Sequence, residues 1–319
     1  MEKTSFFDYN AGVLTHGTWL RMRTWKIVLA SPLLALTLAF TLVPSTKDVF
    51  FISERMIAEF QSSNVAEKDN PPELITVTDV SAYHPSSVAL GKADQYTPPD
   101  FSQIATSRRK EAFYDYLLPM VHNANSEVIL ERRWLMAMGE KLLRQQLLTA
   151  GQLQELIRFE RRYKILAGDE EPAYRIGALL LRVDVVPASL IVAQAAKESG
   201  WGRSRFATEG NNFFGIWCFY RGCGLKPLKR EEGRGHEVAT FDTVEQGVRY
   251  YVRTINTHVA YDDLRDMRAV ARKQQQSSLG EHLANGLIRY SERGMPYVRE
   301  VQSMIRYNNL HRFTRIYSV

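Results

Sequence analysis

Residues 186–217 read VPASLIVAQAAKESGWGRSRFATEGNNFFGIW, and this stretch decides the fold. Pro187 can occupy the first helical position, where its missing N–H costs no hydrogen bond. The residues that follow are apolar on nearly every side, which is typical of a buried helix, and Gly200 is placed to end it. Glu198 lies near the end of this helix, four residues after Gln194, so the two side chains share one face.

The carboxyl group of Glu198 is expected to meet two effects that disfavour its charged form. Apolar surroundings desolvate the anion, and the negative end of the helix dipole repels it. Both effects predict a raised pKa for this carboxyl group. A carboxylic acid that stays protonated near neutral pH can act as a general acid. The alternative is an ordinary glutamate at a solvated helix end.

The residues after the helix carry a resemblance to a known family. The run Glu198-Ser199-Gly200-Trp201-Gly202, followed by NNFFGI at 211–216, resembles the glucosaminidase superfamily. These are bacterial peptidoglycan hydrolases grouped with glycoside hydrolase family 73, and the likeness extends to the Bax-type proteins of Gram-negative bacteria. It spans roughly residues 105–315. The resemblance implies a mainly α, lysozyme-like α+β domain with a small β-hairpin lobe beside the cleft.

Composition agrees with a folded protein that meets an anionic partner. The chain has 319 residues, of which 45% are hydrophobic and 24% charged, as in globular and not disordered proteins. This length allows one large domain or two ordinary ones. The formal net charge of +6 suits an anionic envelope polymer or a membrane surface. The sequence contains no nucleic-acid-binding motif, so we expect no nucleic-acid partner.

The apolar run IVLASPLLALTLAFTLV at 27–43 predicts a transmembrane helix that precedes the folded domain. Its length of about 17 residues is near the lower limit for spanning a bilayer. Basic residues before it place residues 1–26 in the cytoplasm and the remainder outside. We therefore expect a single-pass, uncleaved signal anchor in the inner membrane and a catalytic domain in the periplasm. A cleaved signal peptide and a buried soluble helix are the alternatives.

Three further segments follow the predicted anchor. Residues 44–106 are rich in Pro, Ser, Thr and Asp, which is typical of a linker. Helical periodicity over 107–168 predicts a helical lead segment, and 169–319 would form the glucosaminidase-like catalytic domain. Within that domain, the basic and polar stretch 265–276 predicts a solvated helix.

The chain has two cysteines, Cys218 and Cys223, which are candidates for a disulfide if the domain lies in an oxidising compartment. Only His236 lies near them, too few ligands for zinc. We expect neither a metal nor another cofactor. A Cys218 nucleophile with His236 as its base is the alternative, as in a cysteine hydrolase.

The resemblance implies further site residues. In the family a β-hairpin beside the cleft, here predicted at 225–241, carries a second carboxylate. Glu232 is the preferred match, then Glu231, with Glu237 a third candidate; a solvated turn is the alternative. Tyr290 matches a catalytic tyrosine, although a buried tyrosine bonded to the backbone would look the same.

Several aromatic and amide side chains are candidates for contact with sugar rings, although some of the aromatic rings must belong to the core. These residues are Trp201, Asn211, Asn212, Phe213, Phe214, Trp217, Phe219, Tyr261 and Tyr297.

The expected activity is that of an N-acetylglucosaminidase acting on the glycan strands of peptidoglycan. It would cleave the β-1,4 bond between N-acetylglucosamine and N-acetylmuramic acid, with Glu198 protonating the leaving oxygen. A second carboxylate or the acetamido group of the substrate would assist. One alternative is a muramidase or lytic transglycosylase, and another is a catalytically silent, membrane-tethered protein that binds the cell wall.

Overall fold

The computed structural model describes residues 97–165, 170–228, 236–274 and 279–313. In these ranges the chain is mainly helical with one small antiparallel sheet, which confirms this part of the predicted fold class. The predicted anchor and most of the predicted linker lie outside the described residues. No helix within the described ranges combines the length and the apolarity that a membrane crossing requires.

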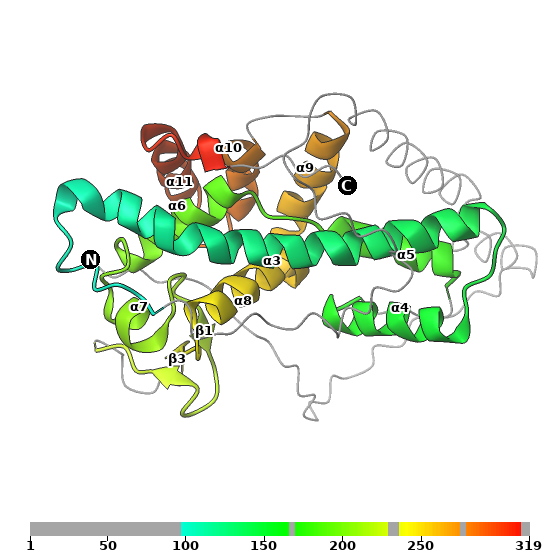
Figure 1. Cartoon of the computed structure of the whole chain (residues 1–319), viewed down its shortest axis with the longest axis horizontal. Coiled ribbons are helices and arrows are strands. Elements are labelled where there is room, and N and C mark those ends of the chain that lie inside the picture. The colour runs from blue at the N-terminus through cyan, green and yellow to red at the C-terminus, as the bar shows by residue number, and fades with distance from the viewer. Residues whose placement is uncertain (1–96, 166–169, 229–235, 275–278, 314–319) are drawn as a thin grey trace, which may run out of the picture.

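The helical lead segment begins with the longest described helix, α3 (Thr106–Leu143), which crosses the whole view in Figure 1. α4 (Ala150–Arg162) starts with a capping box, in which the side chains of Thr149 and Gln152 satisfy each other's backbone N–H groups. α5 (Pro172–Arg182) follows, with its proline in the first turn. The helical periodicity predicted this part correctly.

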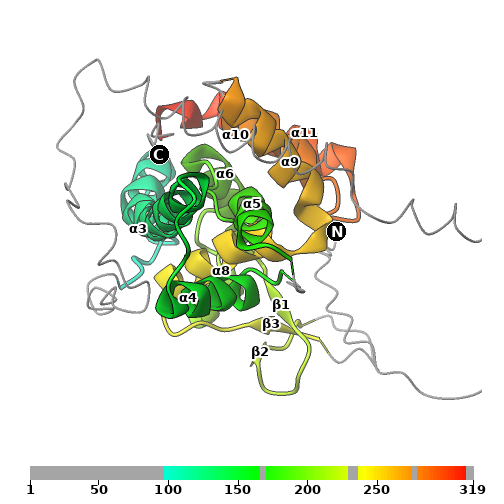
Figure 2. The ribbon, with the colours of Figure 1, turned by 90° about the vertical axis from the view of Figure 1, so that its right-hand side faces the viewer.

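α6 (Ala188–Ser199) is the predicted central helix, and it packs against α3 and the last helices of the chain. In Figure 2 it lies among α3, α5 and α10, with α8 below. Its apolar residues are buried as expected. Gly200 ends it at φ 59°, a left-handed conformation that glycine adopts without steric cost.

The remaining helices complete the domain. They are α7 (Arg205–Gly210), α8 (Val244–Thr257), η5 (Val259–Tyr261), α9 (Asp262–Lys273), α10 (Leu279–Leu283), η6 (Ala284–Leu287), α11 (Met295–Tyr307) and η7 (Leu310–Phe313). One hydrophobic core joins the lead segment to these later helices, with Phe113 of α3 packed near Phe213. The lead segment and the later helices therefore share one core.

The small sheet contains β1 (Trp217–Cys218), β2 (Gly224–Leu225) and β3 (Glu237–Ala239) in the order β1-β3-β2. β2 and β3 form the predicted hairpin, and β1 is an additional strand that the sequence did not predict. A Cβ on Gly224 would lie 1.9 Å from the Val238 carbonyl oxygen, so only glycine fits there. The turn between these strands, with Glu231 and Glu232, lies outside the described residues.

A disulfide bond joins Cys218 to Cys223, which confirms the predicted pairing. The bond leaves no free thiol in the chain, so the alternative of a Cys218 nucleophile is wrong. The Glu237 carboxylate accepts hydrogen bonds from the amides of Gly222 and Gly224, each 3.0 Å long. Glu237 is buried and holds this loop from inside, which accounts for its carboxylate without a catalytic role.

Removing the disulfide should destabilise the folded protein modestly. The two cysteines are five positions apart, and closing so short a loop restricts the unfolded chain by about 2 kcal/mol. We expect the double variant Cys218→Ser/Cys223→Ser to have a free energy of unfolding that is lower by about 2 kcal/mol, seen as a lower urea midpoint. Reductant should lower the wild-type midpoint and leave the variant unchanged; equal midpoints without reductant would contradict the prediction.

A buried charge cluster lies where the chain enters α6. Asp184 accepts from Arg272 of α9, with Nε–Oδ2 at 2.9 Å, and lies 3.8 Å from guanidinium nitrogens of Arg132 and Arg268. Burial alone would raise the pKa of Asp184, but the charges of these arginines outweigh it and lower the pKa. The prediction of a solvated helix over 265–276 is therefore wrong for one face of α9, because Arg268 is only 1% exposed.

Candidate active site

Glu198 lies in the last turn of α6, one residue before its C-terminal serine, and its side chain is partly buried. The left-handed Gly200 turns the chain away immediately after it. The neighbouring Lys197 forms an ion pair with Glu300 of α11. The end of α6 therefore presents one acidic and one basic side chain in succession.

Four buried tyrosines from different parts of the chain form a cluster, and three of them, Tyr251, Tyr290 and Tyr297, interact electrostatically with Glu198. The four are Tyr251, Tyr261, Tyr290 and Tyr297. The rings of Tyr290 and Tyr297 stack with centroids 5.2 Å apart, and Tyr261 lies 6.3 Å from Tyr290. The structure thus brings together three tyrosines that the sequence singled out and adds Tyr251 from α8.

The charge of Glu198 acts on three tyrosines of the cluster. Burial is the main cause that raises the pKa of Tyr251, Tyr290 and Tyr297 well above the usual value, and the negative charge of Glu198 adds to it. The three hydroxyl groups therefore keep their protons at neutral pH. In this site they serve as hydrogen-bond donors and not as bases.

Gln194 connects two of these tyrosines one helical turn before Glu198. Its Nε2 donates to the hydroxyl of Tyr297 at 2.9 Å, while the hydroxyl of Tyr251 donates to its Oε1. Tyr297 thus accepts a hydrogen bond and keeps its own proton for another acceptor. Because the Gln194 amide is fully buried, it fixes the direction of both bonds.

Tyr290, the predicted catalytic tyrosine, is fully buried, and its hydroxyl donates to the carbonyl oxygen of Phe214 at 2.9 Å. This bond ties the segment before α11 to the loop after α7. It matches the arrangement of a buried tyrosine bonded to the backbone. The catalytic role of Tyr290 stays a prediction.

The coupling between Gln194 and Tyr297 can be measured. Removing either partner leaves a buried polar group unsatisfied, so Gln194→Met and Tyr297→Phe should each reduce stability by about 1–3 kcal/mol. The double variant should lose less stability than the sum of the two single losses, by about 0.5–3 kcal/mol. The measurement is urea denaturation of the four proteins. Tyr174→Phe, at an exposed position of α5, is the control. Its effect on stability and that of Gln194→Met should be additive to within about 0.5 kcal/mol.

Both asparagines of the loop motif hold the loop in place. Asn212 is buried; its Oδ1 accepts from the amides of Phe214 and Ile216, and its Nδ2 donates to two carbonyl oxygens, at 2.8 and 2.9 Å. Asn211 adopts a left-handed conformation and donates to the Phe241 carbonyl oxygen. These bonds leave no polar atom of Asn212 for a sugar hydroxyl.

The two phenylalanines of the motif are core residues. Phe213 packs among the aromatic rings of α3, and Phe214 stacks on Tyr251 with centroids 4.2 Å apart. Both are fully buried, as is Tyr261. Packing of the core accounts for these rings without a contact to substrate.

Other predicted aromatic platforms retain an accessible surface. Trp217 of β1 is partly exposed and stacks on His236 at 4.1 Å, and Phe219 is 43% exposed. Trp201 packs edge-on against Phe113 and Tyr114 of α3, with part of its surface open. Their contact with substrate stays a prediction.

Arg293 is an exposed cation that the sequence did not single out. Its guanidinium forms an ion pair with Glu300, which is the main cause that raises the pKa of Arg293, and the charge of Glu198 contributes to the same shift. No pattern in the sequence indicated this, because Arg293 lies in the turn before α11. Among the described residues, no group of His, Cys, Asp and Glu side chains could hold a metal ion.

Comparison with known proteins places this geometry in a family. Residues 178–310 match the glucosaminidase family, described as mannosyl-glycoprotein endo-beta-N-acetylglucosaminidase. Protein bax of Escherichia coli (strain K12) is 31% identical over 200 residues, which cover 63% of this chain and 70% of that protein. The chain is a Bax-type member of the glucosaminidase family. No solved structure gave a significant match.

The family match spans α6, the sheet, the tyrosine cluster and α11 of this Bax-type chain. It supports an enzyme of the glycoside hydrolase type with a glycan as substrate. α3 and α4 lie outside the match, although α3 contributes to the same core.

Proposed function

We propose that this chain hydrolyses the β-1,4 bond between N-acetylglucosamine and N-acetylmuramic acid in peptidoglycan, with Glu198 as the general acid. The observation that carries the proposal is the position of Glu198, at the end of a buried helix and among buried, protonated tyrosines. Membership of the glucosaminidase family supports a glycan as the substrate.

The chemistry requires one proton at the leaving oxygen and one activated water molecule. Glu198 would donate the proton as the sugar develops oxocarbenium character. The Tyr297 hydroxyl, whose proton is not used by Gln194, would donate a hydrogen bond at the same place. Water would be activated by a carboxylate of the hairpin turn, Glu232 or Glu231, or replaced by attack of the substrate's acetamido group.

We further propose that the enzyme works in the periplasm, held to the inner membrane by residues 27–43. The disulfide between Cys218 and Cys223 supports an oxidising compartment, because such bonds are rare where thiols are kept reduced. The basic residues before the apolar run support the orientation.

Identification of the new reducing ends tests the activity. Purified peptidoglycan is digested with the full chain, and the fragments are reduced and identified by mass spectrometry. N-Acetylglucosamine ends support the proposal. Muramic or anhydro-muramic ends would assign the chain to the muramidases or lytic transglycosylases instead. An intact wall with bound protein would favour the catalytically silent alternative.

A further inference from the structure

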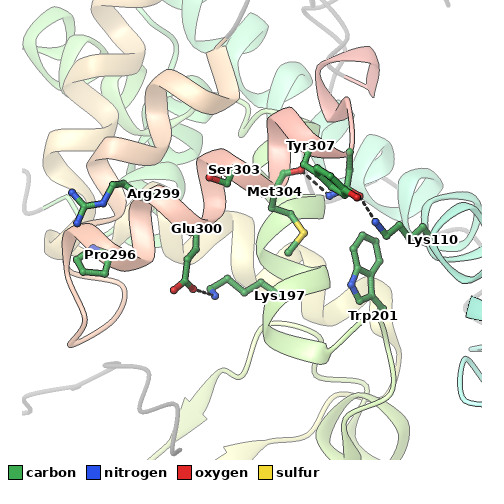
Figure 3. A pocket seen from close by; sticks show the side chains of 10 residues that line it. Lys110, Lys197, Trp201, Pro296, Arg299, Glu300, Ser303, Met304 and Tyr307 are labelled. Carbon is green, nitrogen blue, oxygen red and sulfur yellow. Dashed lines mark hydrogen bonds and ion pairs between the residues drawn. The ribbon is translucent and has the colours of Figure 1, made fainter.

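An open groove of about 690 Å³ lies beside the candidate active site, between the end of α6, α11 and the first turns of α3. Figure 3 shows it in close view. We call it the α6–α11 groove. It is lined by Lys110, Lys197, Trp201, Pro296, Arg299, Glu300, Ser303, Met304, Tyr307 and Asn308. Lys197 directly precedes Glu198, so the groove begins at the residue next to the proposed acid.

Among the described residues that line the groove, Glu300 is the one acidic side chain, and its charge is already neutralised. Glu300 pairs with Lys197 on one side and Arg293 on the other. Hydrogen bonds from Arg293 and Lys197 lower the pKa of Glu300 to about 2, in spite of partial burial. This carboxylate therefore stays charged and paired, and it does not compensate the other cations of the groove.

Two cations of the groove have no carboxylate partner among the described residues. The Lys110 ammonium donates to Asn308 Oδ1 at 2.7 Å and lies between the rings of Trp201 and Tyr307, 5.2 and 5.1 Å from their centroids. Arg299 is exposed on α11. In Figure 3 the two cations occupy opposite ends of the groove.

The surface between them suits a chain of peptide groups. The Ser303 hydroxyl accepts a long hydrogen bond of 3.4 Å from Arg306 and keeps its own proton for a backbone carbonyl group of a ligand. The amide of Asn308 is already used, because its Oδ1 accepts from Lys110 and its Nδ2 donates to the Met304 carbonyl oxygen. Tyr307 is 84% exposed and adds an aromatic face. Charges at both ends and a hydroxyl group between them favour an elongated ligand with at least two separated carboxylates.

We propose that the α6–α11 groove binds the carboxylate-bearing peptide that is attached to the muramic sugar of peptidoglycan. This proposal rests on the proposed function, because that function brings a peptide-bearing sugar to Glu198. Because Lys197, the residue before Glu198, lines the groove, a peptide on the sugar next to the cleaved bond would lie within its reach. The groove would thereby select strands that still carry their peptides over strands that have lost them.

The test is a binding measurement that needs no cleavage. The full chain with Glu198→Gln is titrated with a synthetic four-residue peptide of this type, with free carboxylates, and with the same peptide after amidation of its carboxylates. We expect the free peptide to bind and the amidated one to bind at least tenfold more weakly. Added salt should weaken binding of the free peptide, because the ion pairs between its carboxylates and the cations of the groove would lie near the surface.

Variants assign the binding to the groove. Lys110→Gln/Arg299→Gln should weaken binding of the free peptide about tenfold. Arg299→Gln alone should weaken binding about threefold. This exposed side chain forms no ion pair with another described residue, so the variant separates binding from folding. Arg144→Gln, at the end of α3 and paired with Glu140, removes an exposed arginine that does not line the groove; it is the control and should bind like the parent.

The outcomes separate this proposal from the proposed function. Absent peptide binding, equal binding of the amidated peptide or no effect of the groove variants would overturn the inference, even if peptidoglycan is cleaved. Peptide binding with the expected variant effects would support the groove, even if the reducing ends assign a different bond. In active enzyme, the groove variants should raise KM for peptide-bearing strands and leave it unchanged for peptide-free strands.

Discussion

Replacing Glu198 by Gln is expected to lower kcat for peptidoglycan cleavage by about 10²–10⁴-fold, the usual contribution of a general acid. Glutamine keeps the size of the side chain and its hydrogen-bonding atoms, but it has no carboxylic proton for the leaving oxygen. The position at the end of α6 is partly exposed, so the fold should persist. The measurement is the rate at which new reducing ends appear.

Two comparisons make the Glu198 result specific. Glu140→Gln, on α3, removes a carboxylate that forms an ion pair with Arg144, and its rate should equal that of the wild type. The Glu198→Gln variant should still sediment with the cell wall, because substrate binding does not need the proton. A variant with more than half of the wild-type rate would exclude Glu198 as the acid.

Replacing Asp184 by Asn should reduce the free energy of unfolding by about 3–5 kcal/mol, the usual cost of breaking a buried ion pair. Arg132 and Arg268 are each 1% exposed, so the change leaves buried positive charge without its anion. Burial already lowers the pKa of Arg268 to about 10, against the opposing attraction of Asp184. The measurement is urea denaturation at neutral pH.

The pH dependence of this loss has a definite sign. The folded-state pKa of Asp184 lies below its unfolded value of about 3.9, so its contribution is fully present above that value. It is lost as pH falls through the lower, folded pKa. The difference between wild type and Asp184→Asn should therefore be constant at neutral pH and narrow in acid. Glu209→Gln, at an exposed pair with Arg205, should change stability by about 0.5 kcal/mol or less.

Local signals in the sequence were sufficient for the elements that frame the site. The apolar run before Glu198 predicted α6, and Gly200 predicted its end. The stretch 243–257 has apolar residues at helical spacing, and α8 spans Val244–Thr257. Such signals depend on neighbours within a few turns, which the sequence displays directly.

Long-range partners explain what the sequence did not show. Arg268 reads as a solvated charge because its partner Asp184 lies 84 positions earlier. The hydrogen bond between Tyr251 and Gln194 joins residues 57 positions apart on two helices, so no local pattern in the sequence indicates it. β1 has two residues, too few for an alternating pattern, and it exists because β3 pairs with it.

The core that α3 shares with the later helices has a consequence for folding during synthesis. α3 ends at Leu143, and its partner α8 begins at Val244, about 100 residues later. At a synthesis rate of 5–20 residues per second, the surface of α3 that packs against α8 stays uncovered for about 5–20 s. During this time, chaperones that bind exposed apolar surface can bind α3. We expect α5 and α6 to pack against α3 first and α8 to complete the core, at a rate limited by closure of the longer loop.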